Sequence, residues 1–208
     1  VNATTGEFNT SLGSLSMGVG VTTGNSNVAV GYQSGQALTS GSENITIGQG
    51  AGDALTTGNR NVAVGHAALS TENEHGKNVA IGYLSLLTLD AGVDGFNVAV
   101  GYSAGLAMTT GTRNTLVGGA AGDALTTGVR NVAIGYAALS QEDANSYNVA
   151  IGDSALTQLN AGADGYNVAV GYQAGTAMTT AIKNTLIGAL SGDAITEGGF
   201  NVALGYDA

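Results

Sequence analysis

The chain is organised by a short pattern of apolar and polar positions that recurs along its length. A five-residue block that opens with Asn and closes with Gly, typically Asn-Val-Ala-Val-Gly, occurs twelve times. Successive blocks are 17 residues apart, with one spacing of 18 and two of 19, so four repeats can form a 70-residue superperiod. Residues 51–70 and 121–140 are identical at 17 of 20 positions. The blocks start at Asn9, Asn27, Asn44, Asn61, Asn78, Asn97, Asn114, Asn131, Asn148, Asn167, Asn184 and Asn201.

Within one repeat, numbered from its Asn as position 1, the apolar residues alternate as they do in a strand. Positions 2 and 4 are β-branched or Leu, for example Val62 and Val64, so we expect a short strand whose positions 2 and 4 face the interior. Position 5 is Gly in all twelve copies, which predicts a corner with a positive φ or a close backbone approach. These structural glycines include Gly65, Gly101, Gly135 and Gly171.

The rest of each repeat predicts a second short segment. Position 8 is always Ala or Ser, and the next apolar residue is at position 12, or at position 9 where position 12 is Glu, as in Leu69 with Glu72. The Gly and Thr content favours an extended segment, although a short helical turn also fits this spacing. One unit cannot bury its Val pair, but stacked copies can. We therefore predict a mainly all-β parallel β-solenoid, or β-roll, of 17-residue coils that spans 1–208 as a single repeat domain.

Position 3 is also apolar, although on this reading it faces away from the Val pair. It is Ala in most copies, such as Ala63 and Ala99, and becomes Leu116 or Leu186 where position 2 is Thr. A strand that is apolar on both faces is normally covered on both faces. A second and third copy of the chain would supply the cover, so we predict an intertwined or side-by-side homotrimer. The alternative is a monomer with small exposed Ala columns.

Composition and charge exclude several classes of protein. The chain has 35 Gly in 208 residues and no Pro, Cys or Trp, which excludes a disulfide scaffold and a Cys-ligated metal site. The net charge of −10 argues against nucleic acid and anionic membranes as partners. The sequence offers neither a membrane-spanning apolar run nor a signal peptide. We expect the chain to be a fragment of a longer fibre.

The residue before each Asn is the best candidate for binding, and we call these twelve residues the edge column. All five Lys and Arg residues and all three Phe of the chain are found there. Arg and aromatic side chains suit cation–π contacts and recognition of sugars or acidic glycans. The alternative is a structural lid over the coil corner or over a seam between chains. The candidate binding residues are Arg60, Lys77, Phe96, Arg113, Arg130, Tyr147, Tyr166, Lys183 and Phe200, and the others are Phe8, Ser26 and Glu43.

Two further columns have structural explanations. Position 6 is often Tyr, as in Tyr83, Tyr102 and Tyr172, and either a binding surface or a capped corner accounts for it. The Asn column is expected to stack its amides from coil to coil, because stacked amides hydrogen-bond to one another and Asn tolerates turn geometry. Among its members we assign a structural role to Asn61, Asn97, Asn131 and Asn167.

Metal and catalytic sites are not expected. The two longer repeats carry Asp90 and Asp94, or Asn160 and Asp164, which distantly resemble a calcium loop, but Gly occupies the third ligand place and no Glu follows at the twelfth. A plain Asp-Gly turn explains these residues better. The carboxylates Asp53, Asp123 and Asp193 form a periodic column rather than a catalytic pair. We predict no enzyme activity, no metal and no cofactor.

The blocks NVAVGYQAG, NVAIGYAAL and NTLIGALSG resemble two related families of repeats. One is the head domain of trimeric autotransporter adhesins, which implies a left-handed parallel β-roll trimer. The other is the Asn-Thr-Ala-Ile-Gly-Tyr repeat of phage tail-fibre proteins of the marine and cyanobacterial kind. The resemblance covers the chain from about Asn9 to Ala208. The 17-residue unit is longer than the adhesin repeat, and its position 5 Gly is often followed by Tyr, as in the phage repeat, so the phage fibre is the preferred relative.

These observations lead to three candidate functions. The first is a structural and adhesive segment of an extracellular trimeric fibre, most simply a phage tail fibre on the virion that contributes to host attachment through a surface glycan or protein. The same features fit the head of a bacterial surface adhesin. The second is a passive rod that carries a binding tip elsewhere. The third is an ice-binding solenoid, suggested by Thr doublets such as Thr56 and Thr57, but adjacent strand residues point to opposite faces.

Overall fold

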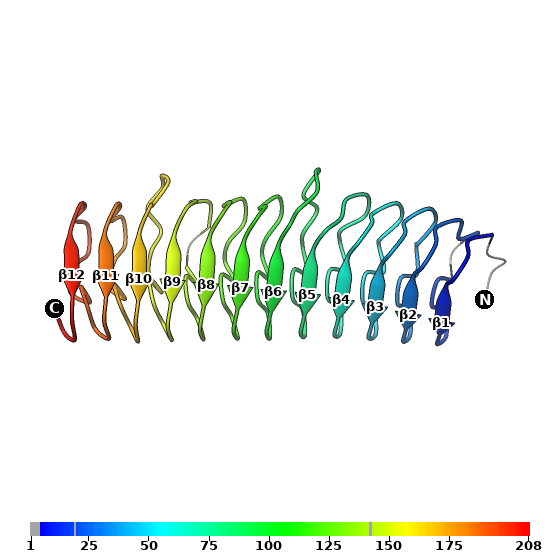
Figure 1. Ribbon diagram of the computed structural model, residues 1–208, viewed down its shortest axis with the longest axis horizontal. Helices are drawn as coiled ribbons and strands as arrows, with labels where there is room; N and C mark the ends of the chain where they lie inside the picture. The colour runs from blue at the N-terminus through cyan, green and yellow to red at the C-terminus, as the bar shows by residue number, and fades with distance from the viewer. Residues whose placement is uncertain (1–4, 19, 142) are drawn as a thin grey trace.

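The computed structural model describes residues 5–18, 20–141 and 143–208, and these form a β-solenoid of parallel strands stacked in one row (Figure 1). Each repeat contributes one three-residue strand, and strand order follows the sequence from β1 to β12. The strands are β1 (Thr10–Leu12), β2 (Val28–Val30), β3 (Ile45–Ile47), β4 (Val62–Val64), β5 (Val79–Ile81), β6 (Val98–Val100), β7 (Thr115–Val117), β8 (Val132–Ile134), β9 (Val149–Ile151), β10 (Val168–Val170), β11 (Thr185–Ile187) and β12 (Val202–Leu204).

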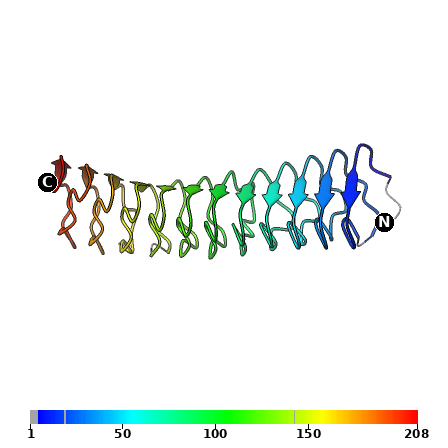
Figure 2. The ribbon, with the colours of Figure 1, turned by 90° about the horizontal axis from the view of Figure 1, so that it is seen from below.

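The register follows the sequence repeat, because each strand pairs with the same three positions of the next. Val62 pairs with Val79 and Ala63 with Ala80, and every other neighbouring pair keeps this alignment. The sheet lies along one side of the rod and the turns lie along the opposite side (Figure 2). The predicted all-β parallel solenoid with 17-residue coils is therefore confirmed.

The second segment of each repeat is a series of turns rather than a strand. The described residues include no helix and no strand outside the twelve above, so the expected second extended segment is wrong. Positions 7 and 9 instead adopt a left-handed conformation, for example Ala67 and Leu69 with φ of 50° and 53°. These turns are joined to the next coil by backbone hydrogen bonds, such as Leu69 N to Ser85 O at 3.0 Å. Lateral pairing between coils thus replaces pairing within a second sheet.

The direction of the strand side chains is the reverse of the sequence-based expectation. Position 3 faces the interior, since Ala63, Ala99 and Leu116 are all fully buried. Positions 2 and 4 face outward and are partly exposed, with Ile134 36 % exposed. Both faces of each strand are apolar. The alternation of side chains along the strand therefore does not show which face points into the solenoid.

The interior is filled by position 3 together with positions 8, 9 and 12 of the turns. Leu55, Met108 and Leu125 occupy position 12 and are fully buried. Where position 3 is Leu116, position 9 of the same coil is Gly122, and a Cβ on that glycine would lie 2.9 Å from Leu116 Cδ2. Large and small residues therefore alternate within a coil so that the interior is filled without overlap.

Position 5 must be Gly, which has no side chain, for two independent reasons. All twelve have φ between 127° and 146°, a region that other residues rarely adopt. A Cβ on Gly135 would also lie 2.3 Å from the carbonyl oxygen of Gly152 in the next coil. The predicted corner is confirmed, and the close approach of successive corners follows from the stacking of the coils.

The Asn column forms a continuous ladder inside the rod, as expected. In each of the eleven steps, the side-chain Oδ1 of one Asn accepts a hydrogen bond from the backbone N–H of the next, for example Asn97 Oδ1 from Asn114 N at 2.9 Å. The Asn97 Nδ2 also donates to the carbonyl oxygen of Gly111 at 2.9 Å. Asn97 and Asn114 are fully buried. The ladder thus satisfies the polar backbone at the start of each strand.

Candidate functional site

The edge column runs along the start of the strands, where each member occupies a strained backbone position. All twelve residues have φ between 49° and 63°, which is the left-handed region that favours Gly. None of the twelve is Gly, and they include large residues such as Phe96, Arg113 and Tyr166. A non-Gly residue costs about 1–2 kcal/mol in this conformation. The backbone therefore does not explain why side chains occur at this position in every coil.

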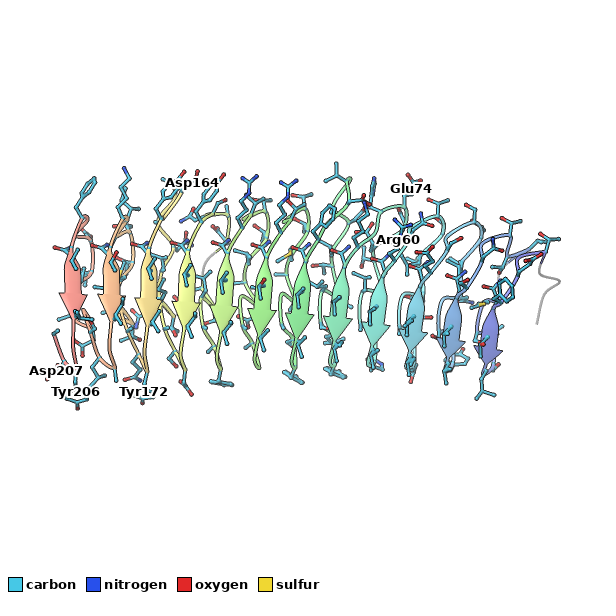
Figure 3. The ribbon with its side chains drawn as sticks, in the orientation of Figure 1. Arg60, Glu74, Asp164, Tyr172, Tyr206 and Asp207 are labelled. Carbon is cyan, nitrogen blue, oxygen red and sulfur yellow. The ribbon has the colours of Figure 1, made fainter. Side chains whose placement is uncertain are left out.

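The side chains of the edge column project into solvent and interact with one another along the rod. Arg60, labelled in Figure 3 at the edge where the strands begin, pairs with Glu43 of the preceding coil at 2.7 Å, and the side chain of Arg60 is 62 % exposed. The Tyr147 and Tyr166 rings stack with their centroids 4.9 Å apart. Arg130 lies over the Tyr147 ring and donates a hydrogen bond to its hydroxyl at 2.8 Å. Neighbouring members therefore support one another.

Two further cation–aromatic pairs belong to this column. The Nζ of Lys77 lies 4.9 Å from the centroid of Phe96, and the Nζ of Lys183 lies 5.0 Å from the centroid of Phe200.

Arg113 is exposed, and its side chain makes no hydrogen bond or ion pair with any residue in the ranges 5–18, 20–141 and 143–208. The structure thus brings the predicted binding residues into one exposed row and leaves the Arg113 guanidinium free to contact a ligand.

A polar hollow of about 370 Å³ opens within this row. Two ion pairs stand beside it, because Lys77 binds Asp94 as Arg60 binds Glu43. The hydrogen bond that Lys77 donates lowers the pKa of the Asp94 carboxyl below its usual range, and the hydrogen bond that Arg60 donates to Glu43 raises the pKa of Arg60. The hollow is lined by Ser42, Glu43, Asn59, Arg60, Lys77 and Asp94. Such a mixture of hydrogen-bond donors and acceptors matches polar ligands such as sugars.

A second exposed row runs along the opposite ends of the strands, where the position 6 residues lie. Tyr172 and Tyr206 mark this edge in Figure 3. The rings of His66, Tyr83 and Tyr102 stack in succession, with centroids 5.1 Å and 5.3 Å apart. Tyr102 is 64 % exposed, so this row lies on the surface of the rod.

Between the two rows lies an apolar surface, which we call the outer sheet face. It consists of positions 2 and 4 of every strand, mostly Val and Ile, and it continues over all twelve coils. Its most exposed central members are Ile45, Ile47, Ile81, Ile134 and Ile187, with exposed fractions between 36 % and 41 %. Monomeric proteins rarely present a contiguous apolar surface of this extent.

The structure does not bring the candidate catalytic carboxylates together. Asp53 and Asp123 occupy equivalent places four coils apart, which is roughly 19 Å at the usual strand spacing. Burial raises the pKa of each carboxyl, and the Oδ1 atom of each is buried without a hydrogen-bond partner among the described residues. In the loop that distantly resembles a calcium site, Asp94 forms an ion pair with Lys77. This contact fits an Asp-Gly turn better than a calcium ligand.

One cluster was not anticipated from the sequence. Glu72, His75 and Asp90 come together between neighbouring coils, and one potential ligand atom of each lies within 4.8 Å of the others. Glu72 is at position 12, where most other coils have a buried Leu or Met, and it is fully buried. The replacement of an apolar core residue by Glu72 was the one feature of the sequence that could have indicated this cluster. His75 and Asp90 belong to different repeats, so only the stacking of coils shows that they meet.

Comparison with models of known protein families, with curated proteins and with solved structures finds no match for this chain. Within the described residues, no helix has the length and apolar character needed to cross a membrane. Any assignment of function therefore depends on the geometry of the exposed columns and of the outer sheet face.

Proposed function

We propose that the chain is a structural and adhesive segment of an extracellular fibre in which three copies pack through their outer sheet faces. The edge column of each copy would then contact a host surface glycan or protein. A phage tail fibre on the virion is the preferred setting, and the head of a bacterial surface adhesin is the alternative. The observation that carries the proposal is the apolar surface along the rod, which positions 2 and 4 of the strands form mostly from Val and Ile.

The outer sheet face supports self-association for a simple reason. Its residues repeat at the strand spacing, so a second copy packed alongside makes the same contact at every coil. Three copies around one axis would cover this face on each with a single repeated interface. Position 3, which predicted a trimer from the sequence, is buried within the chain, and positions 2 and 4 instead form the apolar face that supports self-association.

The edge column supports an adhesive role rather than a passive one. Phe96 and Tyr166 are 49 % and 50 % exposed in the single chain, so these side chains are available to a ligand and are not buried over the corner of their own coil. Weak contacts repeated at each coil and on three chains would combine into strong attachment. Ice binding is disfavoured because Thr hydroxyls of the doublets donate to backbone carbonyls of the next coil, as Thr56 does to Asn73 O at 2.9 Å.

Self-association is tested by measuring mass in solution. Sedimentation of the parent chain at micromolar concentration should give three times the chain mass of 20.3 kDa. Replacing Ile81, Ile134 and Ile187 together by Lys should release folded monomers, because these side chains lie on the outer sheet face. Val93→Lys is the matched control, since Val93 is 57 % exposed but lies in a turn.

The control variant should keep the parent mass, and both variants should keep the parent circular dichroism spectrum. A parent chain that stays at 20.3 kDa would refute the trimer. A parent mass of twice that value would replace the trimer by a dimer.

Adhesion is tested on an array of bacterial surface polysaccharides. The Arg113→Ser/Arg130→Ser variant should lose binding while its thermal stability stays close to that of the parent, because both side chains are exposed. Thr110→Glu/Thr127→Glu changes the net charge by the same amount at exposed positions outside the edge column. An equal loss of binding in both variants would mean that only net charge matters. A large loss of thermal stability in Arg113→Ser/Arg130→Ser would mean that the edge column is a packing element. If the parent chain binds neither the polysaccharides nor bacterial cells, the passive rod is favoured.

A further inference from the structure

The cluster of Glu72, His75 and Asp90 joins two coils at a place where the interior carries a carboxylate. Glu72 and His75 belong to the coil that begins with β4, and Asp90 belongs to the coil that begins with β5. Glu72 is fully buried, His75 is partly buried and Asp90 is exposed. The cluster therefore extends from the interior to solvent, which gives an ion a route of entry.

The hydrogen bonds of the cluster leave its inner side incomplete. Glu72 Oε1 accepts a bond from His75 N at 3.1 Å, and Glu72 Oε2 accepts one from Ala91 N at 3.4 Å. The His75 Nδ1 atom lies 3.7 Å from Glu72 Oε1, which is too far for a hydrogen bond, and it is buried without a partner in the described part of the chain. An imidazole nitrogen and a carboxylate oxygen thus face each other across a gap.

That gap has the size expected for two ligands of one metal ion. Two bonds of about 2.1 Å at a tetrahedral angle place their donor atoms about 3.4 Å apart. Lys77 is already paired with Asp94, so its ammonium is not available to the two carboxylates. A carboxylate oxygen accepts hydrogen bonds and cannot donate one, so two carboxylates cannot satisfy each other. A positive ion bound between the Glu72 and Asp90 carboxylates would give both of them an attractive partner.

The second superperiod provides an internal comparison. Seventy residues further along, Glu72 corresponds to Glu142, which lies outside the described residues, while His75 corresponds to Asn145 and Asp90 to Asn160. The carboxylate is kept, and both of its neighbours change to amides. Amide N–H groups can donate to a carboxylate, whereas Asp cannot. Glu72 therefore lacks the amide donors that Asn would offer in place of His75 and Asp90, and a metal ion would serve its carboxylate instead.

We propose that Glu72, His75 and Asp90 bind one divalent transition-metal ion, best matched by Zn²⁺, which links the coils of β4 and β5. One imidazole nitrogen with two carboxylates is a donor set that Zn²⁺ accepts, and the exposed side of Asp90 leaves a position for water. Ca²⁺ fits less well because it takes six to eight oxygen ligands. This inference goes against the sequence-based expectation that the chain holds no metal, and it does not depend on the proposed fibre function.

The experiment uses the chain after treatment with a chelator and dialysis. Titration with Zn²⁺ in a calorimeter should give one site per chain and should raise the thermal unfolding midpoint. Co²⁺ in the same site should show visible absorption that Zn²⁺ displaces. The His75→Asn/Asp90→Asn variant, which carries the residues of the second superperiod, should fold like the parent and lose both signals.

Two controls identify the ligands. His66→Asn removes the only other histidine of the chain and should leave binding unchanged, as should Asp94→Asn, which alters the neighbouring ion pair. Binding that survives in His75→Asn/Asp90→Asn or disappears in His66→Asn would overturn the assignment. Absence of saturable Zn²⁺ binding by the parent would overturn it as well.

Discussion

Removing one amide from the middle of the Asn ladder should destabilise the solenoid strongly. Asn97→Ala deletes the bond from Asn97 Nδ2 to Gly111 O, at 2.9 Å, and the bond from Asn114 N to Asn97 Oδ1, also at 2.9 Å. The stranded Asn114 N–H and Gly111 C=O are both in buried residues. A buried polar group left without a partner costs about 1–3 kcal/mol, so the loss for two groups is about 2–6 kcal/mol.

The end of the ladder supplies the matched control. Asn201 is exposed, and its side chain donates to Asn184 Oδ1 at 2.9 Å without accepting from a following Asn. Asn201→Ala should therefore cost only the net value of one hydrogen bond, about 0.5–1.5 kcal/mol.

The assay is urea unfolding of parent and variants at one fixed protein concentration, because self-association would make the apparent stability depend on concentration. Asn97→Ala is expected to shift the unfolding midpoint several times further than Asn201→Ala. Equal shifts would refute the claim that the ladder satisfies buried backbone groups. A shift for Asn97→Ala below about 1 kcal/mol would refute it as well.

Three further predictions concern the corner, the interior and the buried carboxyls. Gly135→Val should prevent stable folding at that coil, because its Cβ would lie 2.3 Å from a carbonyl oxygen, whereas Gly119→Ala should be tolerated, since its Cβ would lie 3.4 Å from the nearest atom; melting temperatures compare the two. Leu116→Ala should cost about 2–5 kcal/mol in urea unfolding, because it empties a fully buried site, and an unchanged midpoint would contradict that burial. Burial raises the pKa of Asp53 and Asp123 above 3.8, so their contribution to stability is present below that pH and is lost as the pH rises through the raised pKa. Asp53→Asn/Asp123→Asn should therefore become more stable than the parent as the pH rises from about 3 to 7, and parallel pH profiles would refute this.

The stacking of coils could be predicted from the sequence, because an Asn and a Gly that recur at a fixed spacing must occupy equivalent places in every coil. The inside of the sheet could not be predicted in the same way. Val at positions 2 and 4 is larger than Ala at position 3, so size alone pointed to the wrong face. A better signal was the pairing of Leu116 with Gly122, because two positions that exchange volume are in contact.

The candidate site shows a similar division. The edge column was predictable as a row, since every member precedes an Asn of the ladder. Its left-handed backbone was not, because residues such as Phe96 and Lys77 carry no preference for that conformation. The repeated hydrogen bonds between coils hold the backbone there, for example Lys77 N to Asn59 O at 3.0 Å. Local preference is overridden by contacts that exist only in the stack.

Each strand contacts only the strands before and after it in the sequence, within the part of the chain that the structure describes. A duplication or deletion of one 70-residue block would therefore join two surfaces that already fit each other. The change would alter the rod by four coils, roughly 19 Å, while every remaining column stayed in line. Genetic recombination between the two superperiods could thus tune the reach of the molecule without requiring any new packing solution.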